Sequence, residues 1–189
     1  AVDMDTPAPE QLLEFWVGKG IKGIRLGCET RSKGNDPLAI WRKASELGIV
    51  VSVPGRVEQF ASDSFKEIVE SMSTLTIVME HLGNIPDPEG PRPGPEIEPP
   101  YRMSRKMFEL SRYPNTYIKV GGFGEFCTGH FPYEKIPPLF QMAYDAFGAR
   151  RMMWGSDFPP VSFREGYRNA LEFPLNNISF KTDLDKEWI

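Results

Sequence analysis

The sequence predicts an α/β fold of the TIM (β/α)₈-barrel type, built from alternating helices and parallel strands. Amphipathic helical stretches alternate with short apolar, often β-branched runs along the whole chain. Most successive strands begin roughly 30 residues apart, which is close to the length of one barrel unit. Polar residues directly follow several of these strands, where the functional residues of barrels lie. Together these observations favour a barrel wall with its active-site edge.

Each expected strand is an apolar run that ends at a turn signal or a polar residue. The five expected strands cover residues 21–26, 49–53, 76–81, 116–122 and 151–157. The expected helices carry apolar residues three and four positions apart, and several stop at a glycine. They cover residues 12–17, 40–47, 65–72, 101–110, 136–147 and 164–173. One helical stretch between each pair of strands predicts parallel pairing through right-handed crossovers.

The chain is expected to form a single domain over residues 1–189, but an incomplete one. Five of the eight βα units are accounted for, so the first three strands, in about 90 residues, are expected to be missing. The chain begins at Ala1 instead of Met, and it ends on Trp188 and Ile189 within a helical pattern. An open, doubly wound sheet of five strands is the alternative architecture.

A long proline-rich segment follows the third expected strand. Residues 84–100 are dense in proline and include Gly90 and Gly94, so neither helix nor strand is expected there. This segment is interpreted as a long βα loop that roofs an active site, with a plain surface linker as the alternative. The glycines of residues 121–124 lack the spacing of a phosphate-binding loop, which argues against nucleotide binding.

Composition narrows the classes of function further. The net charge of -4 and the pI of about 5.3 provide no basic field for nucleic acid. No apolar run reaches the roughly 18 residues of a membrane span, and the first residues do not resemble a signal peptide. Cys28 and Cys127 are too few for a disulfide framework, which suits a reducing compartment. We therefore expect a cytoplasmic protein that acts on a small molecule, and a homo-oligomer stays open.

Asp157 and His81 are the candidate catalytic residues. Asp157 directly follows an apolar strand, where a partly desolvated carboxylate can bind a metal or take a proton from water. The alternative is that Ser156 or Asp157 only caps the following turn. His81 ends the third expected strand, where it can ligate a metal, carry a proton or donate a hydrogen bond. A lone histidine beside an apolar strand is also a common structural residue.

Arg25, Lys119 and His130 are the candidate substrate-binding residues. If the face of the first strand that carries Arg25 lines the barrel, its guanidinium is suited to a substrate carboxylate. The same holds for Lys119 in the fourth strand, and a surface position is the alternative for both. His130 belongs to the loop after the fourth strand, above the barrel mouth. Strand alternation places Glu80 on the face opposite His81; Glu80 could contribute near the site, but nothing in the sequence ranks it above a solvated charge.

Three motifs stand at or near the expected strands: Gly-Ile-Lys-Gly-Ile-Arg at 20–25, Val-Met-Glu-His-Leu-Gly-Asn at 78–84 and Met-Trp-Gly-Ser-Asp-Phe-Pro at 153–159. In this order they resemble signatures of amidohydrolase family 2. The likeness is greatest to its lactonase-like branch, which includes 2-pyrone-4,6-dicarboxylate lactonase. The resemblance implies a distorted (β/α)₈ barrel and hydrolysis at a carbonyl carbon.

The resemblance also implies roles for individual residues. Asp157 matches the aspartate that activates water, His81 a histidine that ligates metal or substrate, and Arg25 an arginine that binds anionic substrate. One divalent metal, Zn or Mn, held by Asp157 and His81 is compatible with the family, and so is a metal-free mechanism. The family's His-x-His pair is absent, and two histidines in all exclude a binuclear site. Residues 51–54 stand where the family has a further histidine.

The resulting hypothesis is a hydrolase that opens a lactone or related carbonyl substrate. Asp157 acts as general base, His81 orients or ligates, and Arg25 holds a substrate carboxylate. A decarboxylase of the same fold, acting on an aromatic or enol acid, is one alternative. A defective fragment or binding-only paralogue is the other, and its open strand edges would pair with a partner.

Overall fold

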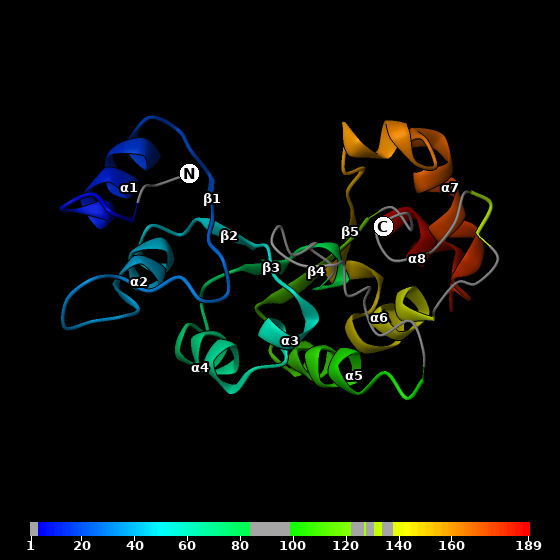
Figure 1. The fold of residues 1–189 in the computed structure, drawn as a ribbon, viewed down its shortest axis with the longest axis horizontal. Helices are drawn as coiled ribbons and strands as arrows, with labels where there is room; N and C mark the ends of the chain where they lie inside the picture. Colours follow the sequence, from blue (N-terminus) through cyan, green and yellow to red (C-terminus); the bar gives the residue numbers. More distant parts are fainter. Residues whose placement is uncertain (1–3, 84–98, 122–126, 128–130, 134–137) are drawn as a thin grey trace.

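The fold is known from a computed structural model, which describes residues 4–83, 99–121, 127, 131–133 and 138–189. Its centre is a sheet of parallel strands in the order β1-β2-β3-β4-β5 (Figure 1). The strands are β1 (Gly23–Arg25), β2 (Val50–Val53), β3 (Ile77–Met79), β4 (Thr116–Val120) and β5 (Met152–Trp154). Each strand pairs with the next one in the sequence, as in a barrel wall. The doubly wound alternative requires a reversal of strand order and is therefore wrong.

Helices connect the strands and cover one side of the sheet. The α-helices are α1 (Pro9–Gly18), α2 (Ala39–Glu46), α3 (Val57–Phe60), α4 (Asp63–Ser71), α5 (Arg102–Phe108), α6 (Leu139–Phe147), α7 (Tyr167–Asn177) and α8 (Asp183–Trp188). Short 3-10 turns are η1 (His81–Gly83), η2 (Glu109–Arg112), η4 (Ala149–Arg151) and η5 (Pro160–Phe163). Figure 1 shows α2, α4, α5 and α6 along the same side. This arrangement follows from right-handed crossovers between parallel neighbours.

The two faces of the sheet differ in chemistry and burial. The helix-covered face carries mostly buried side chains: Ile24, Val51, Val53, Ile77, Met79, Thr116, Ile118, Val120 and Met152. These pack with buried aromatic residues of the helices, among them Trp41 and Phe65. The opposite face carries Arg25, Ser52 and Lys119, which keep exposed or part-exposed side chains. In a barrel this second face is the inner one, and functional residues lie at the C-terminal ends of its strands.

The strands are shorter than the sequence pattern predicts. β3 ends at Met79 and β5 at Trp154, before the polar residues that were expected to complete them. His81 and Asp157 instead have φ values of 54° and 52°, a left-handed conformation that no strand continues. The segment 84–98 of the expected proline-rich loop lies outside the described residues.

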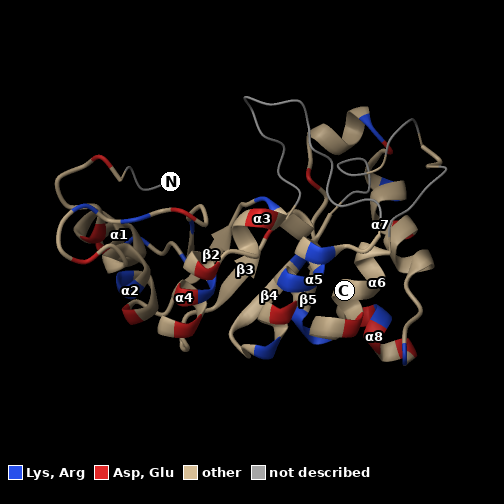
Figure 2. Cartoon of the chain, turned by 60° about the horizontal axis from the view of Figure 1, so that its bottom comes forward, with Lys and Arg blue, Asp and Glu red and all other residues tan. Residues whose placement is uncertain are grey.

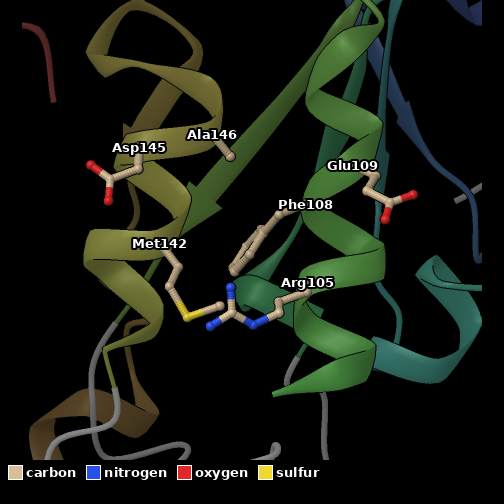
Figure 3. A pocket seen from close by; sticks show the side chains of 6 residues that line it. All are labelled: Arg105, Phe108, Glu109, Met142, Asp145 and Ala146. Atoms are coloured by element: carbon tan, nitrogen blue, oxygen red, sulfur yellow. The ribbon is translucent and has the colours of Figure 1, made fainter. Parts of the chain in front are cut away.

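Charge is mixed over the surface of the described chain. Figure 2 shows basic and acidic residues interspersed on the helices, in agreement with the small net charge of -4. None of the helices in the described part is long and apolar enough to span a membrane. A groove of about 440 Å³ lies between α5 and α6, lined by Arg105, Phe108, Glu109, Met142, Asp145 and Ala146 (Figure 3). These helices cover the apolar face, so the groove is separate from the polar strand ends.

Candidate active site

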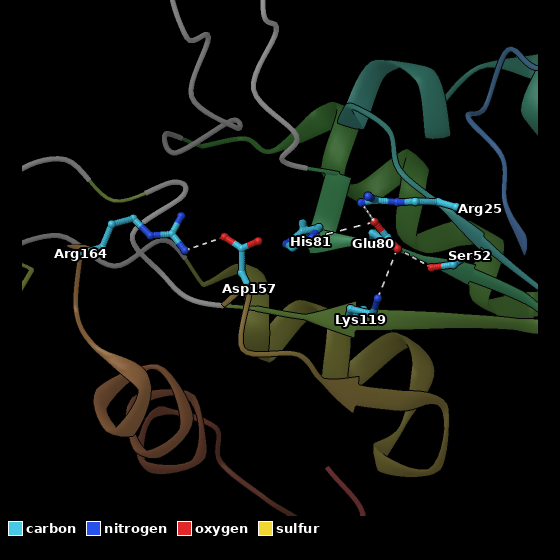
Figure 4. A network of polar contacts seen from close by, with 7 residues as sticks. All are labelled: Arg25, Ser52, Glu80, His81, Lys119, Asp157 and Arg164. Atoms are coloured by element: carbon cyan, nitrogen blue, oxygen red, sulfur yellow. Dashed lines mark hydrogen bonds and ion pairs between the residues drawn. The ribbon is translucent and has the colours of Figure 1, made fainter. Parts of the chain in front are cut away.

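The candidate site lies at the edge of the sheet where the strands end. Glu80 directly follows β3 and stands at the centre of this edge (Figure 4). Its carboxylate accepts hydrogen bonds from Arg25 of β1 and Ser52 of β2. The Nζ of Lys119, from β4, lies 3.3 Å from Oε1 of the same carboxylate. One carboxylate thus joins the ends of β1 to β4.

Glu80 is buried, with only 4% of the residue exposed. Burial by itself would raise the pKa of Glu80, but hydrogen bonds from Ser52 and Arg25, together with the charge of Lys119, outweigh it. The pKa of Glu80 therefore lies below its ordinary value, and the side chain is a carboxylate at neutral pH. Two cations face one anion here, so the cluster carries an excess of positive charge.

His81 follows Glu80 in a tight turn. His81 and Leu82 both have a φ of 54° and Gly83 has a φ of 75°, a left-handed run that leaves the strand direction. The expected alternation, which placed His81 on the face of Met79, therefore stops at Met79. The imidazole Nε2 lies 3.9 Å from Oε2 of Glu80, and the side chain is 12% exposed. His81 is thus part of the Glu80 cluster.

Two glycines leave room for these side chains at the ends of β4 and β5. A Cβ on Gly121 would lie 3.2 Å from Nδ1 of His81 and 3.6 Å from the carbonyl oxygen of Gly155. A Cβ on Gly155 would lie only 2.9 Å from Cδ of Lys119. His81 therefore lies against the end of β4, and Lys119 lies across the end of β5, the strand that leads to Asp157.

Asp157 lies in the turn beyond β5 and makes a separate set of contacts. Its Oδ2 accepts a hydrogen bond from the NH2 group of Arg164 at 2.7 Å, and the two side chains are 23% and 21% exposed. The turn itself is capped by Ser156, whose hydroxyl accepts from the N–H of Phe158 at 3.2 Å. The capping role therefore falls to Ser156. In Figure 4, His81 lies between Glu80 and Asp157.

Arg164 also contacts a second, buried carboxylate, that of Glu165. The Nε of Arg164 is 3.6 Å from Oε2 of Glu165, whose side chain is only 2% exposed. The hydroxyl of Tyr133 donates to the same oxygen at 3.0 Å. Burial, followed by the negative charge of Glu165, raises the pKa of Tyr133, so its hydroxyl stays protonated and remains a donor. Arg164 thus bridges an accessible carboxylate and a buried one.

The structure brings Arg25, His81 and Lys119 into contact with Glu80 or its neighbours at one edge of the sheet, and Figure 4 shows Asp157 on the same edge, on the far side of His81. His130 lies outside the described residues. Burial, with the charge of Glu165, raises the pKa of Cys127 to about 12, so this residue is a thiol and a poor nucleophile.

Five residues of these clusters escaped sequence reasoning: Ser52, Glu80, Tyr133, Arg164 and Glu165. The sequence did not distinguish Glu80 from a solvated charge, whereas the structure shows that the residue is buried and paired with Arg25. The sequence did contain an indication of the role of Glu80. Strand alternation puts Glu80 on the face opposite Met79, and the candidate cations Arg25 and Lys119 lie at the ends of other strands. Arg164 offered no such signal, because its contact with Asp157 depends on the shape of a turn.

Comparisons with known proteins agree with this fold and with the sequence motifs. The family model described as amidohydrolase matches residues 1–189. L-fucono-1,5-lactonase from Burkholderia ambifaria is 36% identical over 53 residues, which are 28% of this chain and 18% of the lactonase. The chain belongs to the amidohydrolase family, and its likeness to a lactonase accords with the lactonase-like motifs.

Solved structures of the same family share the fold. An amidohydrolase from Burkholderia multivorans with bound zinc has a TM-score of 0.68 and 17% identity, over 99% of this chain and 67% of that one. A protein from Pseudomonas putida, proposed to be a 2-pyrone-4,6-dicarboxylic acid hydrolase, has a TM-score of 0.63 and 20% identity, over 99% and 66%. The chain thus spans about two thirds of these relatives, all of the amidohydrolase TIM-barrel type.

The zinc-bound relative shows that the family includes proteins with a divalent metal. Among the described residues of this chain, no group of three or more His, Cys, Asp or Glu side chains is placed to hold a metal ion. The carboxylate of Glu80 is contacted by Arg25, Ser52 and Lys119, and Oδ2 of Asp157 by Arg164. Both carboxylates already contact cations of the protein, so the described residues as they are arranged here do not form a divalent-metal site.

Proposed function

We propose that this chain belongs to an enzyme that hydrolyses a lactone, or a related carbonyl compound, of small size and negative charge. The supporting observation is the meeting of a part-exposed carboxylate, a histidine and two cations at one edge of the sheet. Asp157 is the general base in this proposal, and His81 orients the carbonyl group. Barrel enzymes place their catalytic groups at this edge.

The two cations of the Glu80 cluster argue for an anionic substrate. The side chain of Arg25 is 57% exposed and that of Lys119 is 26% exposed, so both are reachable from the inner face of the sheet. Glu80 neutralises one of these two charges. A substrate carboxylate would balance the other, and a guanidinium has donors for two carboxylates.

The proposed reaction is the addition of water to the lactone carbonyl. Asp157 removes a proton from water as the new C–O bond forms, which gives a tetrahedral intermediate. The acyl–oxygen bond of the ring then breaks, and the proton held by Asp157 passes to the ring oxygen as it leaves. The product is an open hydroxy acid, and no redox partner is needed. Near the carbonyl, the positive charge of Lys119 would stabilise the developing oxyanion.

The test is hydrolysis of a lactone panel, with and without a carboxylate substituent, by the chain and by Asp157→Asn. We expect Asp157→Asn to lower kcat by about 100-fold or more, because general bases contribute at least that much. The control is Asp145→Asn, which changes an exposed aspartate of α6 and should leave the rate unchanged. Circular dichroism checks that both variants fold.

Other outcomes of this experiment would contradict the proposal. If Asp157→Asn stays within about tenfold of the parent rate, the residue is not the base. Release of carbon dioxide from aromatic or enol acids, without lactone opening, would assign the site to the decarboxylase alternative. Ligand binding without turnover of either class would favour a binding protein.

A further inference from the structure

Asp157 is the residue that a metal-dependent relative would be expected to use, yet here its carboxylate faces an arginine. The 2.7 Å contact between Oδ2 and Arg164 is a charge-assisted hydrogen bond of normal length. It forms within a short stretch of chain, because the N–H of Arg164 donates to the carbonyl of Val161 at 3.2 Å and Val161 donates to that of Asp157 at 3.1 Å. The backbone conformation of this turn therefore places the guanidinium of Arg164 beside the carboxylate of Asp157.

Arg164 is also held by a second ion pair, with Glu165. Its Nε lies 3.6 Å from the buried carboxylate of Glu165, which accepts from Tyr133. Tyr133 is fixed in an aromatic cluster, with ring centroids 5.7 Å from Phe131 and 6.4 Å from Phe173. Moving Arg164 away from Asp157 would separate two ion pairs, one of them on a buried acid, which is energetically costly.

We propose that Arg164 is the resident cationic partner of Asp157 in this protein. It positions the carboxylate, and it occupies Oδ2, one of the two oxygens on which a divalent metal could bind. A fixed guanidinium also repels a second cation a few ångströms away. In this chain Asp157 is therefore a weak metal ligand, and an arginine supplies the positive charge beside it. The inference goes beyond the proposed function, because it holds whether or not the site opens lactones.

The test is calorimetric titration of the chain with Zn²⁺ and with Mn²⁺ at constant pH. We expect Arg164→Met to bind Zn²⁺ about tenfold or more tightly than the parent chain, because a neighbouring positive charge is removed. Arg164→Lys keeps a cation and should restore weak binding. The gain should vanish in the double variant Arg164→Met with Asp157→Asn, which assigns it to this carboxylate.

Arg168→Met is the matched control. Arg168 is the second residue of α7, is exposed, and pairs with Glu172 at 2.7 Å, so its removal should not change metal affinity. Thermal unfolding checks each variant. If Arg164→Met does not fold, Tyr133→Phe replaces it in the test. This variant removes the hydrogen bond that Tyr133 donates to Glu165, so Arg164 is held less firmly, and Zn²⁺ affinity should rise about twofold to threefold.

Two results would overturn the inference. One is tight Zn²⁺ or Mn²⁺ binding by the parent chain that Asp157→Asn abolishes, because Arg164 then does not keep the metal away. The other is equal affinity of the parent and the folded Arg164 or Tyr133 variants. Neither readout uses enzymatic activity, so a failure here is distinguishable from a failure of the proposed lactone hydrolysis.

Discussion

Glu80 and Asp157 both follow a strand and both pair with an arginine, but their surroundings differ. Glu80 is 4% exposed and is contacted by side chains from three other strands. The side chain of Asp157 is 23% exposed, and its ion-pair partner is Arg164 of the same turn. A carboxylate fixed by several strands is a scaffold, whereas one held from a single turn stays accessible to a ligand.

This difference gives Glu80 and Asp157 complementary roles at the edge of the sheet where the strands end. Glu80 fixes the positions of Arg25 and Lys119 on the inner face. Because only 4% of the residue is exposed, Glu80 itself has little surface that a substrate could contact. Asp157 has that surface, and its partner belongs to a local loop. Sequence position alone does not separate the two residues, because each comes just after an apolar strand.

The largest effect on stability is expected for Glu80→Ala. The free energy of unfolding should fall by about 3 kcal/mol, because two cations lose the buried carboxylate that they share. The value belongs at the lower end of the range for buried pairs, since the exposed Arg25 can turn to water. Asp157→Ala should cost less than about 1 kcal/mol, as for other accessible ion pairs.

Urea unfolding followed by circular dichroism measures both losses. Similar losses for the two variants would break the distinction between a scaffold carboxylate and an accessible one. A larger loss for Asp157→Ala would reverse it, and would mean that the turn beyond β5 depends on the contact with Arg164.

Much of the fold could be predicted from the sequence, because the spacing of apolar residues indicates which side of a helix or strand is buried. The apolar runs of β2 and β4 predicted strands, and the helical stripe of α6 predicted a helix, where the structure has them. The ends of β3 and β5 were predicted too far along the chain. Left-handed φ values at His81 and Asp157 end these strands, and neither residue type signals this conformation reliably.

The candidate site was predicted in part for a similar reason. Arg25 and Lys119 belong to strands, so alternation could place them on the inner face. Arg164 and Glu165 lie in a loop, and Tyr133 reaches Glu165 from 32 residues away. Contacts of that kind depend on tertiary packing, which no local pattern encodes.

A smaller effect is expected from acid, and it concerns Glu80. Its pKa is lowered in the folded protein, so the stabilisation is complete above the unfolded-state pKa of about 4.3 and is lost as pH falls through the folded-state pKa. Protonated glutamic acid resembles glutamine in charge. The gap in Tm between the parent chain and Glu80→Gln should therefore be constant near neutral pH and close in acid. A gap that persists at the lowest pH would locate the stabilising contact elsewhere.

A small effect is expected at Gly155, where Lys119 of the Glu80 cluster lies close to the end of β5, the strand that leads to Asp157. A methyl group there would lie 2.9 Å from Cδ of Lys119, so the lysine would have to leave its rotamer, at a cost of about 1 kcal/mol. In a Lys119→Ala background the clash disappears, and Gly155→Ala should then cost almost nothing. Unfolding free energies of the four proteins in this cycle measure the coupling. Gly27→Ala is the control, because its nearest neighbour, Oγ1 of Thr30, is at an ordinary 3.7 Å. Additive costs at Gly155 and Lys119 would show that the lysine does not lie across β5, and would separate the two carboxylate clusters.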